Sequence, residues 1–134
     1  MINEELINAY RKTEYCIFKP AIVIKIGELS ESLDELLKQY DQQDWTFISA
    51  CNPYSKILSD TENNERHLHL KEAMKAYKYF EGEGIGEDLS WKPEKSLLVI
   101  GINRENAIEV GRHFKQNAIV IGEVGKPAAL KLLM

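Results

Sequence analysis

Short apolar runs of strand length alternate along this chain with segments of helical periodicity. The run 95–102 reads Lys-Ser-Leu-Leu-Val-Ile-Gly-Ile, and the run 45–50, from Trp45 to Ala50, is a second apolar segment. Apolar residues elsewhere recur at the spacing i, i+3, i+4, i+7, in the sets Leu33, Leu36, Leu37, Tyr40 and Leu70, Ala73, Met74, Tyr77. Strands and helices that interleave in this way predict a β-sheet flanked by helices.

The pattern predicts the elements in order along the chain. We expect helices over 3–12, 30–41, 60–77 and 104–114, and strands over 14–19, 21–26, 45–50, 78–81, 95–102, 117–122 and 128–133. Adjacent strand pairs near both ends of the chain are typical of antiparallel sheet edges. We therefore predict an α+β fold, with a mixed central sheet of about six to seven strands and about four flanking helices. The glycines at 82, 84 and 86 indicate a loose loop that runs to Pro93.

Length and composition predict one globular domain over residues 1–134. The chain has 44% hydrophobic and 28% charged residues, which is typical of a folded protein. No apolar run approaches the ~18 residues that a membrane span needs. The first residues, Met1 to Glu5, lack the apolar segment of a signal peptide, so we expect a cytoplasmic protein without a membrane partner. Cys16 and Cys51 are expected to be buried free thiols.

The charge pattern makes nucleic acid an unlikely partner. The formal net charge is −4, whereas binding through phosphates needs clustered Lys and Arg. The lysines at 71, 75 and 78 surround Glu72, which indicates a solvated helix face. His67 and His69 are two residues apart and point in different directions on a helix, so we predict no metal site there. The sequence indicates no particular cofactor.

A polar loop, Asn52 to Ser55, follows the apolar run that ends at Ala50 and leads into the helix 60–77. When the apolar stripe of that helix is projected backwards from Leu70, it continues through Arg66, Asn63 and Glu62. Buried polar groups are costly unless they are paired, so a pocket at the helix N-terminus is one explanation. Arg66 is suited to hold an anion there, and Glu62 is the candidate catalytic base.

A purely structural explanation of the same residues stays open. Ser59-Asp60-Thr61-Glu62 matches a capping box, and Glu62 and Arg66 have the i, i+4 spacing of a helix salt bridge. The Asn52-Pro53 pair is also an ordinary turn signal. Gln116 and Asn117 begin a predicted strand, and the direction of that strand decides whether their amides lie at the same end of the sheet as Asn52.

These positions belong to a longer pattern. It comprises Ala50-x-Asn52-Pro53-x-Ser55, Ser59-x-x-Glu62-Asn63, Arg66, Gly82-x-Gly84, Trp91-x-x-Glu94-x-Ser96, Gly101 and Gln116-Asn117-Ala118-Ile119. The pattern resembles a bacterial family of small proteins that is known only as a domain of unknown function. Lys115 departs from the resemblance, which leads us to expect Gly before Gln116. The resemblance implies a common site for Asn52, Glu62, Asn63, Arg66, Gln116 and Asn117, and it implies no reaction.

Two hypotheses of function follow from these observations. In the first, the chain binds a small polar or anionic ligand, and a nucleotide-like molecule is the leading candidate. The ligand-binding residues are then Asn52, Ser55, Glu62, Asn63, Arg66, Gln116 and Asn117. In the second, the chain is a protein–protein interaction module without catalytic activity, and the polar residues are structural. Whether the chain is an enzyme is left open by the sequence.

Overall fold

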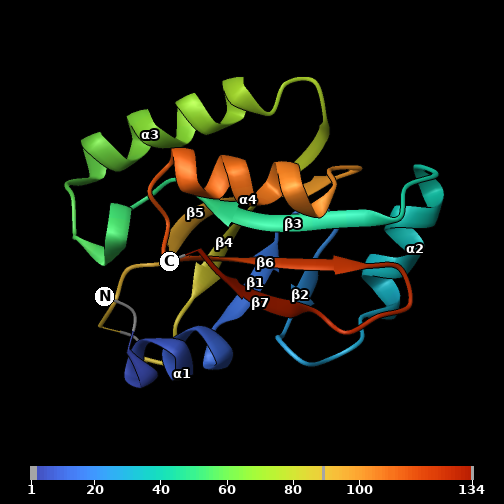
Figure 1. Cartoon of the computed structure of the whole chain (residues 1–134), viewed down its shortest axis with the longest axis horizontal. Coiled ribbons are helices and arrows are strands. Elements are labelled where there is room, and N and C mark those ends of the chain that lie inside the picture. Colours follow the sequence, from blue (N-terminus) through green and yellow to red (C-terminus); the bar gives the residue numbers. More distant parts are fainter. Residues whose placement is uncertain (1–2, 89, 134) are drawn as a thin grey trace.

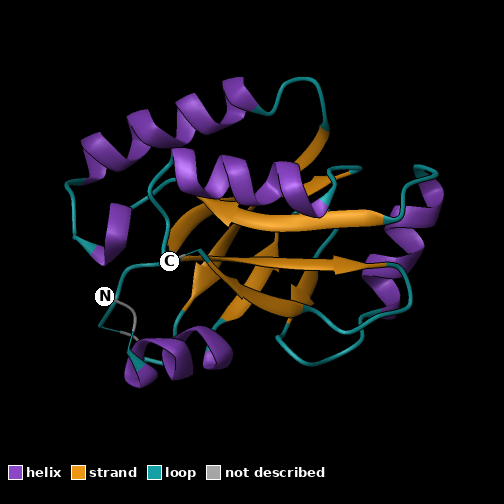
Figure 2. Ribbon diagram, in the orientation of Figure 1, coloured by secondary structure: helices purple, strands orange, loops and turns teal. Residues whose placement is uncertain are grey.

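The computed structural model describes residues 3–88 and 90–133, and these residues form four α-helices and seven β-strands. In chain order the elements are α1 (Glu4–Lys12), β1 (Glu14–Ile17), β2 (Ile22–Ile24), α2 (Glu31–Gln39), β3 (Asp44–Ser49), the 3₁₀ turn η1 (Pro53–Ser55), α3 (Asp60–Ala73), β4 (Lys78–Ile85), β5 (Glu94–Ile100), α4 (Arg104–His113), β6 (Ala118–Glu123) and β7 (Ala129–Leu132). Figure 1 and Figure 2 show the curled sheet between its helices. The predicted α+β fold is confirmed.

The strands form a sheet in the order β2-β1-β4-β5-β3-β6-β7, and every pair of neighbouring strands is antiparallel. The strands that a helix connects do run in the same direction, namely β3 with β4 and β5 with β6. They are not neighbours in the sheet, because β5 lies between β3 and β4, and β3 lies between β5 and β6. Among the described residues, the expected mixed character is therefore limited to one isolated parallel bridge, between Ile26 and Ala128.

This bridge brings the two ends of the sheet together. Gly27 N donates to Ala128 O at 2.8 Å, and Ala128 N donates to Glu28 O at 3.2 Å. Ile26 follows the edge strand β2, and Ala128 precedes the opposite edge strand β7. The sheet consequently curls so that its edges touch at one end, and it acquires an inner and an outer face.

Each face of the curled sheet has its own hydrophobic core, because side chains alternate along a strand. The inner core joins alternate strand residues to the leucines of α2, among them Leu37, Phe47, Leu98 and Ile100. The outer core packs the neighbouring strand residues against α3 and α4, which lie above the sheet in Figure 1. It includes Ile48, Leu70, Leu97, Val99 and Ala107. Helix α2 lies at one end of the sheet in the same view.

The helices begin where the sequence provides caps. The side chains of Ser30, Ser59 and Asn103 each accept a hydrogen bond from the first turn of α2, α3 and α4. The third helix ends at Ala73 rather than at residue 77, and Ala73 is exposed instead of lying on the buried stripe. In the part of the chain that the structure describes, no helix is both long enough and apolar enough to cross a membrane.

The glycine-rich loop is the element on which the prediction was wrong. Strand β4 extends through Gly82 and Gly84 to Ile85 and pairs with both β1 and β5. A Cβ atom on Gly82 would collide with the carbonyl oxygen of Cys16, so this glycine permits a close approach of two strands. The irregular segment is confined to 86–93, and Leu89 within it lies outside the described residues.

Candidate functional site

Most of the predicted site residues converge at the end of the sheet that lies opposite α2. Figure 1 shows α1, η1 and the start of α3 gathered at this end. The residues come from the loop before α3, from α3 itself, from the turn between α4 and β6, and from the start of β5. We name them the polar cluster, which comprises Asn52, Ser55, Asn63, Arg66, Glu94, Gln116 and Asn117.

Asn52 is the centre of the polar cluster. Its backbone N–H donates to Asn63 Oδ1 at 2.9 Å, and its Oδ1 accepts from Asn63 Nδ2 at 2.9 Å and from the Leu58 amide at 3.0 Å. Its Nδ2 donates to Glu94 Oε2 at 2.8 Å. One asparagine therefore connects the loop before α3, the first turn of that helix and the start of β5.

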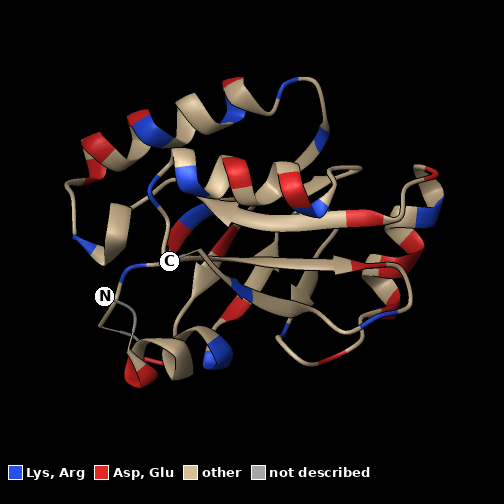
Figure 3. Cartoon of the chain, in the orientation of Figure 1, with Lys and Arg blue, Asp and Glu red and all other residues tan. Residues whose placement is uncertain are grey.

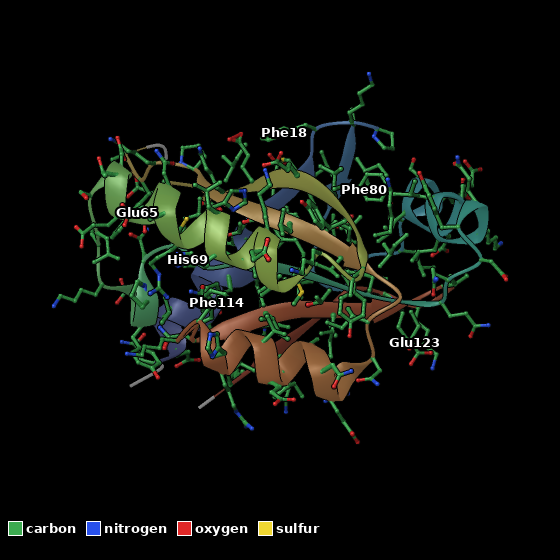
Figure 4. The ribbon with its side chains drawn as sticks, turned by 90° about the horizontal axis from the view of Figure 1, so that it is seen from above. Phe18, Glu65, His69, Phe80, Phe114 and Glu123 are labelled. Carbon is green, nitrogen blue, oxygen red and sulfur yellow. The ribbon has the colours of Figure 1, made fainter. Side chains whose placement is uncertain are left out.

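Arg66 lies half-buried beneath this loop and binds backbone carbonyls. Its Nε donates to Ala50 O, and one terminal nitrogen donates to Phe114 O at 2.6 Å. Figure 4 shows Phe114 between α3 and α4, where its ring is buried. Within 3–88 and 90–133, Arg66 makes no ion pair with a carboxylate. The i, i+4 salt bridge with Glu62, which was one part of the structural explanation, is therefore not formed, whereas the capping box of Ser59 and Glu62, another part, is present.

Glu62 does not continue the buried stripe, so that expectation was wrong. Its side chain is exposed and closes a capping box, in which Glu62 Oε1 accepts from Ser59 Oγ at 2.9 Å and from Ser59 N at 3.2 Å. These bonds lower the pKa of Glu62. Asn63, Arg66 and Leu70 lie on the face of α3 that is turned toward the sheet. Glu62 precedes Asn63 by one residue and is exposed to solvent instead.

The direction of β6 places Gln116 and Asn117 in the polar cluster. Because β6 is antiparallel to β3, its first residues lie beside the last residues of β3. Gln116 Nε2 donates to Cys51 O at 3.1 Å and to Phe114 O at 3.2 Å. Asn117 Nδ2 donates to Ser55 Oγ at 2.9 Å. Both amides are buried, so the strand start and the loop before α3 stabilise each other.

Glu94 belongs to the polar cluster, although sequence reasoning did not select it as a site residue. Burial raises the pKa of the Glu94 carboxyl, and the hydrogen bond from Asn52 opposes that effect only partly. Among the described residues, no Lys, Arg or His lies within ion-pair distance of it. The only sequence signal was the Glu94-x-Ser96 element of the family resemblance.

Two tyrosines lie near this carboxylate. Burial raises the pKa of Tyr10 and that of Tyr15, and the charge of Glu94 contributes to both increases. Ser55 and Asn117 lie close enough to the Tyr10 phenol to lower its pKa in part. Tyr15 Oη donates to the backbone carbonyl of Tyr10 at 2.6 Å. The end of α1 is thus part of the surroundings of the polar cluster.

Unusual backbone conformations concentrate around the polar cluster. Asn52, Tyr54 and Ser55 have φ values of 47°, 53° and 63°, in the left-handed region that non-glycine residues seldom adopt. Lys115 has a φ of 59°, and it follows the C-cap of α4 at the position that glycine usually occupies. Strained residues of this kind often gather at binding sites.

Other features that could take part in a site lie outside the polar cluster. His67 is buried, its Nε2 lies 3.1 Å from Glu81 Oε1, and its Nδ1 has no hydrogen-bond partner within the described ranges. This hydrogen bond is the main reason why the pKa of Glu81 is lowered. A hollow of about 260 Å³ is lined in part by Glu123. Figure 4 shows Glu123 far from Phe114, toward the α2 side of the molecule. No group of three metal-binding side chains occurs in the described segments.

Comparison with known proteins identifies a family and no activity. Residues 48–119, which are more than half of the chain and include every member of the polar cluster, match a family described as "Protein of unknown function (DUF3293)". No curated protein matches the chain, and no solved structure matches it. The match confirms the family of unknown function that the motif pattern predicted. The chain is therefore a member of the DUF3293 family of proteins of unknown function.

Proposed function

We propose that the polar cluster binds a small polar ligand and that Glu94 is the main recognition group. The observation that carries the proposal is the state of this carboxylate. Glu94 is half-buried, its carboxylate accepts one hydrogen bond from Asn52, and it has no cationic partner among the described residues. An unpaired carboxylate in such a place destabilises a fold and is typical of a functional site.

The chemistry of Glu94 favours a ligand that donates hydrogen bonds. An amine, amide or hydroxyl group would satisfy the free lone pairs of the carboxylate. If the bound molecule also reacts, Glu94 is a better acid–base candidate than Glu62. A raised pKa allows a carboxyl group to hold and release a proton nearer neutral pH, whereas the pKa of Glu62 is lowered by its cap.

An anionic or nucleotide-like ligand is the second form of the proposal. It is favoured by Arg66, whose half-buried guanidinium has no carboxylate partner in the described chain. Two features oppose it. Arg66 already donates to two carbonyls, and the first turn of α3 carries Asp60 and Glu62, the acidic residues at the start of that helix in Figure 3. We therefore rank it below the hydrogen-bond donor.

A thermal-shift screen tests both forms. The wild type is compared with Glu94→Gln and Arg66→Lys against amines, amides, sugars and nucleotides, and with Glu87→Gln as an exposed control. We expect a donor-bearing class to raise the melting temperature of the wild type and of Glu87→Gln, and not that of Glu94→Gln. Loss of a nucleotide response in Arg66→Lys alone would favour the anionic form. The absence of any response from the wild type contradicts both.

A protein–protein interaction module is the alternative function, and exposed apolar side chains near the polar cluster favour it. Tyr54, Ile57 and Trp91 are more than half exposed. An ion pair between the exposed side chains of Lys92 and Asp60, at 3.1 Å, places the segment of Trp91 beside the start of α3. Under this alternative, Ile57→Ser and Trp91→Ser abolish capture of a partner, while Glu94→Gln leaves capture unchanged.

A further inference from the structure

A second candidate site lies at the other end of the sheet from the polar cluster. The hollow of about 260 Å³ there, which we name the α4 cavity, is lined by the start of β3, the start of α4 and the turn between β6 and β7. Its lining includes two buried apolar residues and four charged ones, namely Ile102, Ile121, Asp44, Arg104, Glu123 and Lys126. Strand β3 begins at this cavity and ends three residues before Asn52, so the two sites are separated by the length of the strand.

Two carboxylates lie opposite each other at the α4 cavity. Asp44 and Glu123 are directly paired across the antiparallel strands β3 and β6, and Figure 3 shows the red start of β3 beside the red end of β6. Like charges in such a pair destabilise a sheet. Lys126 contacts Glu123 at 3.4 Å, whereas the half-buried Asp44 has no ion pair within the described residues. The pair therefore favours a positively charged group between its two side chains.

The start of α4 provides the opposite charge in the same cavity. Arg104 is the first residue of this helix, and it forms no ion pair with Asp44 or with any other described carboxylate. The Asn103 side chain caps the amide of Asn106, while the amides of the first helical residues have no partner within the helix. A helix N-terminus and a guanidinium group both favour an anion. The exposed Glu105 in the same turn opposes one, but it does not line the cavity.

We propose that the α4 cavity binds a small zwitterion with an apolar side chain, which is the chemistry of an apolar α-amino acid. The ammonium group lies between Asp44 and Glu123, the carboxylate is held by Arg104, and the side chain packs on the buried Ile102 and Ile121. Asp44 and Arg104 line one cavity without pairing, and a molecule with both charges satisfies both. A cavity of about 260 Å³ lies below the roughly 300–1,000 Å³ of sites for drug-sized ligands, which limits the ligand to this size.

Isothermal titration calorimetry tests the two charged ends separately. The probes are leucine, 3-methylbutylamine, which lacks the carboxylate, and 4-methylpentanoate, which lacks the ammonium group. We expect the wild type to bind leucine, and to bind each of the other two at least about tenfold more weakly. Asp44→Asn and Arg104→Gln should each weaken leucine binding by at least about tenfold. The exposed substitutions Glu109→Gln and Arg11→Gln are the matched controls and should leave it unchanged.

Amide chemical shifts measured by NMR locate the binding. Leucine should shift the amides of Arg104 and Gly122 and leave those of Asn52 and Asn63 unchanged. Shifts at Asn52 and Asn63 instead would assign leucine to the polar cluster and overturn the proposal, as would no binding to the wild type or equal binding of 3-methylbutylamine.

The loss of binding in Asp44→Asn must not arise from unfolding. Because this substitution removes one of two like charges, it should not lower the melting temperature. If it does, Glu123→Gln must weaken leucine binding for the proposal to stand. The proposal does not depend on the polar cluster, so a screen that finds no ligand there leaves these measurements valid.

Discussion

At the scale of single residues, the polar cluster combines features that stabilise the fold with one that does not. Asn52, Asn63, Gln116 and Asn117 satisfy one another and nearby backbone groups, which explains why much of the motif pattern falls here. Glu94 is the exception, because it is half-buried and its carboxylate has, within the described residues, a hydrogen bond from the amide of Asn52 and no ion pair. Residues that a protein retains at a cost in stability are candidates for function.

Glu94→Gln should stabilise the unliganded protein at neutral pH. The raised pKa of Glu94 means that the folded state binds its proton more tightly than the unfolded state does. Its contribution to stability is fully present below the unfolded-state pKa and is lost as the pH rises through the folded-state pKa. Glutamine can still accept from Asn52 and carries no charge. Urea unfolding of both proteins across the acidic to neutral range measures the difference.

We expect the gain in Glu94→Gln to be largest at neutral pH and to shrink as the pH falls. The exposed substitution Glu87→Gln is the control and should leave the free energy of unfolding almost unchanged. A loss of stability in Glu94→Gln at neutral pH would mean that the carboxylate is a structural acceptor, which would remove the main support for a ligand site.

The sequence could identify part of the polar cluster and not all of it. Asn63 and Arg66 were predicted to face the sheet from the stripe that leads to Leu70, and they do. Glu62 was predicted to lie on the same stripe because residues three and four apart both count as neighbours on a helix. Its side chain closes the capping box with Ser59 instead and is exposed to solvent. Glu94 gives no periodic signal, since its burial depends on loops that come from other parts of the chain.

At the scale of elements, the turn after α4 has a left-handed conformation that usually requires glycine, although this chain has Lys115 there. The amide of Lys115 donates to Arg112 O at 3.0 Å, and the amide of Gln116 donates to Gly111 O at 3.0 Å. This is a Schellman arrangement, which requires a left-handed residue at position 115. The family resemblance led us to expect Gly there, and the conformation of Lys115 explains that expectation.

Lys115→Gly should therefore stabilise the protein. A non-glycine residue in the left-handed region costs about 1–2 kcal/mol, while glycine loses about 0.5–1 kcal/mol through its greater freedom in the unfolded chain. We expect a net gain of about 0.5–1 kcal/mol in urea unfolding. Lys115→Ala is the control, because it removes the charge and retains the strained conformation. Equal effects of the two substitutions would show that the side chain, and not the backbone, is responsible.

At the scale of the whole molecule, local patterns could predict the elements but not their arrangement. The helices and most strands lie within a few residues of their expected positions, because periodicity and caps are local. The order of strands depends on pairs that are distant in sequence, such as β3 with β6 and Ile26 with Ala128. The extension of β4 through Gly82 has the same origin, since close packing against β1 favours a residue that otherwise signals a loop.

The curled sheet predicts two cores of comparable importance on opposite faces of one strand. Leu97 and Leu98 are adjacent in β5 and both fully buried, yet Leu97 packs under α3 and α4 and Leu98 packs in the core with α2. Each substitution, Leu97→Ala and Leu98→Ala, should lower the free energy of unfolding by about 2–5 kcal/mol. In a sheet with one solvated face, only one of them would be costly.

Urea unfolding monitored by circular dichroism measures both effects, and Leu68→Ala on the exposed side of α3 is the control. Leu68 is 60% exposed, so its loss should change the free energy of unfolding by less than about 0.5 kcal/mol. The double variant Leu97→Ala/Leu98→Ala tests whether the faces act separately. Adjacent residues usually couple, but these two side chains lie in different clusters, so their effects should add within about 0.5 kcal/mol. A tolerated substitution at either position would contradict the two-core fold.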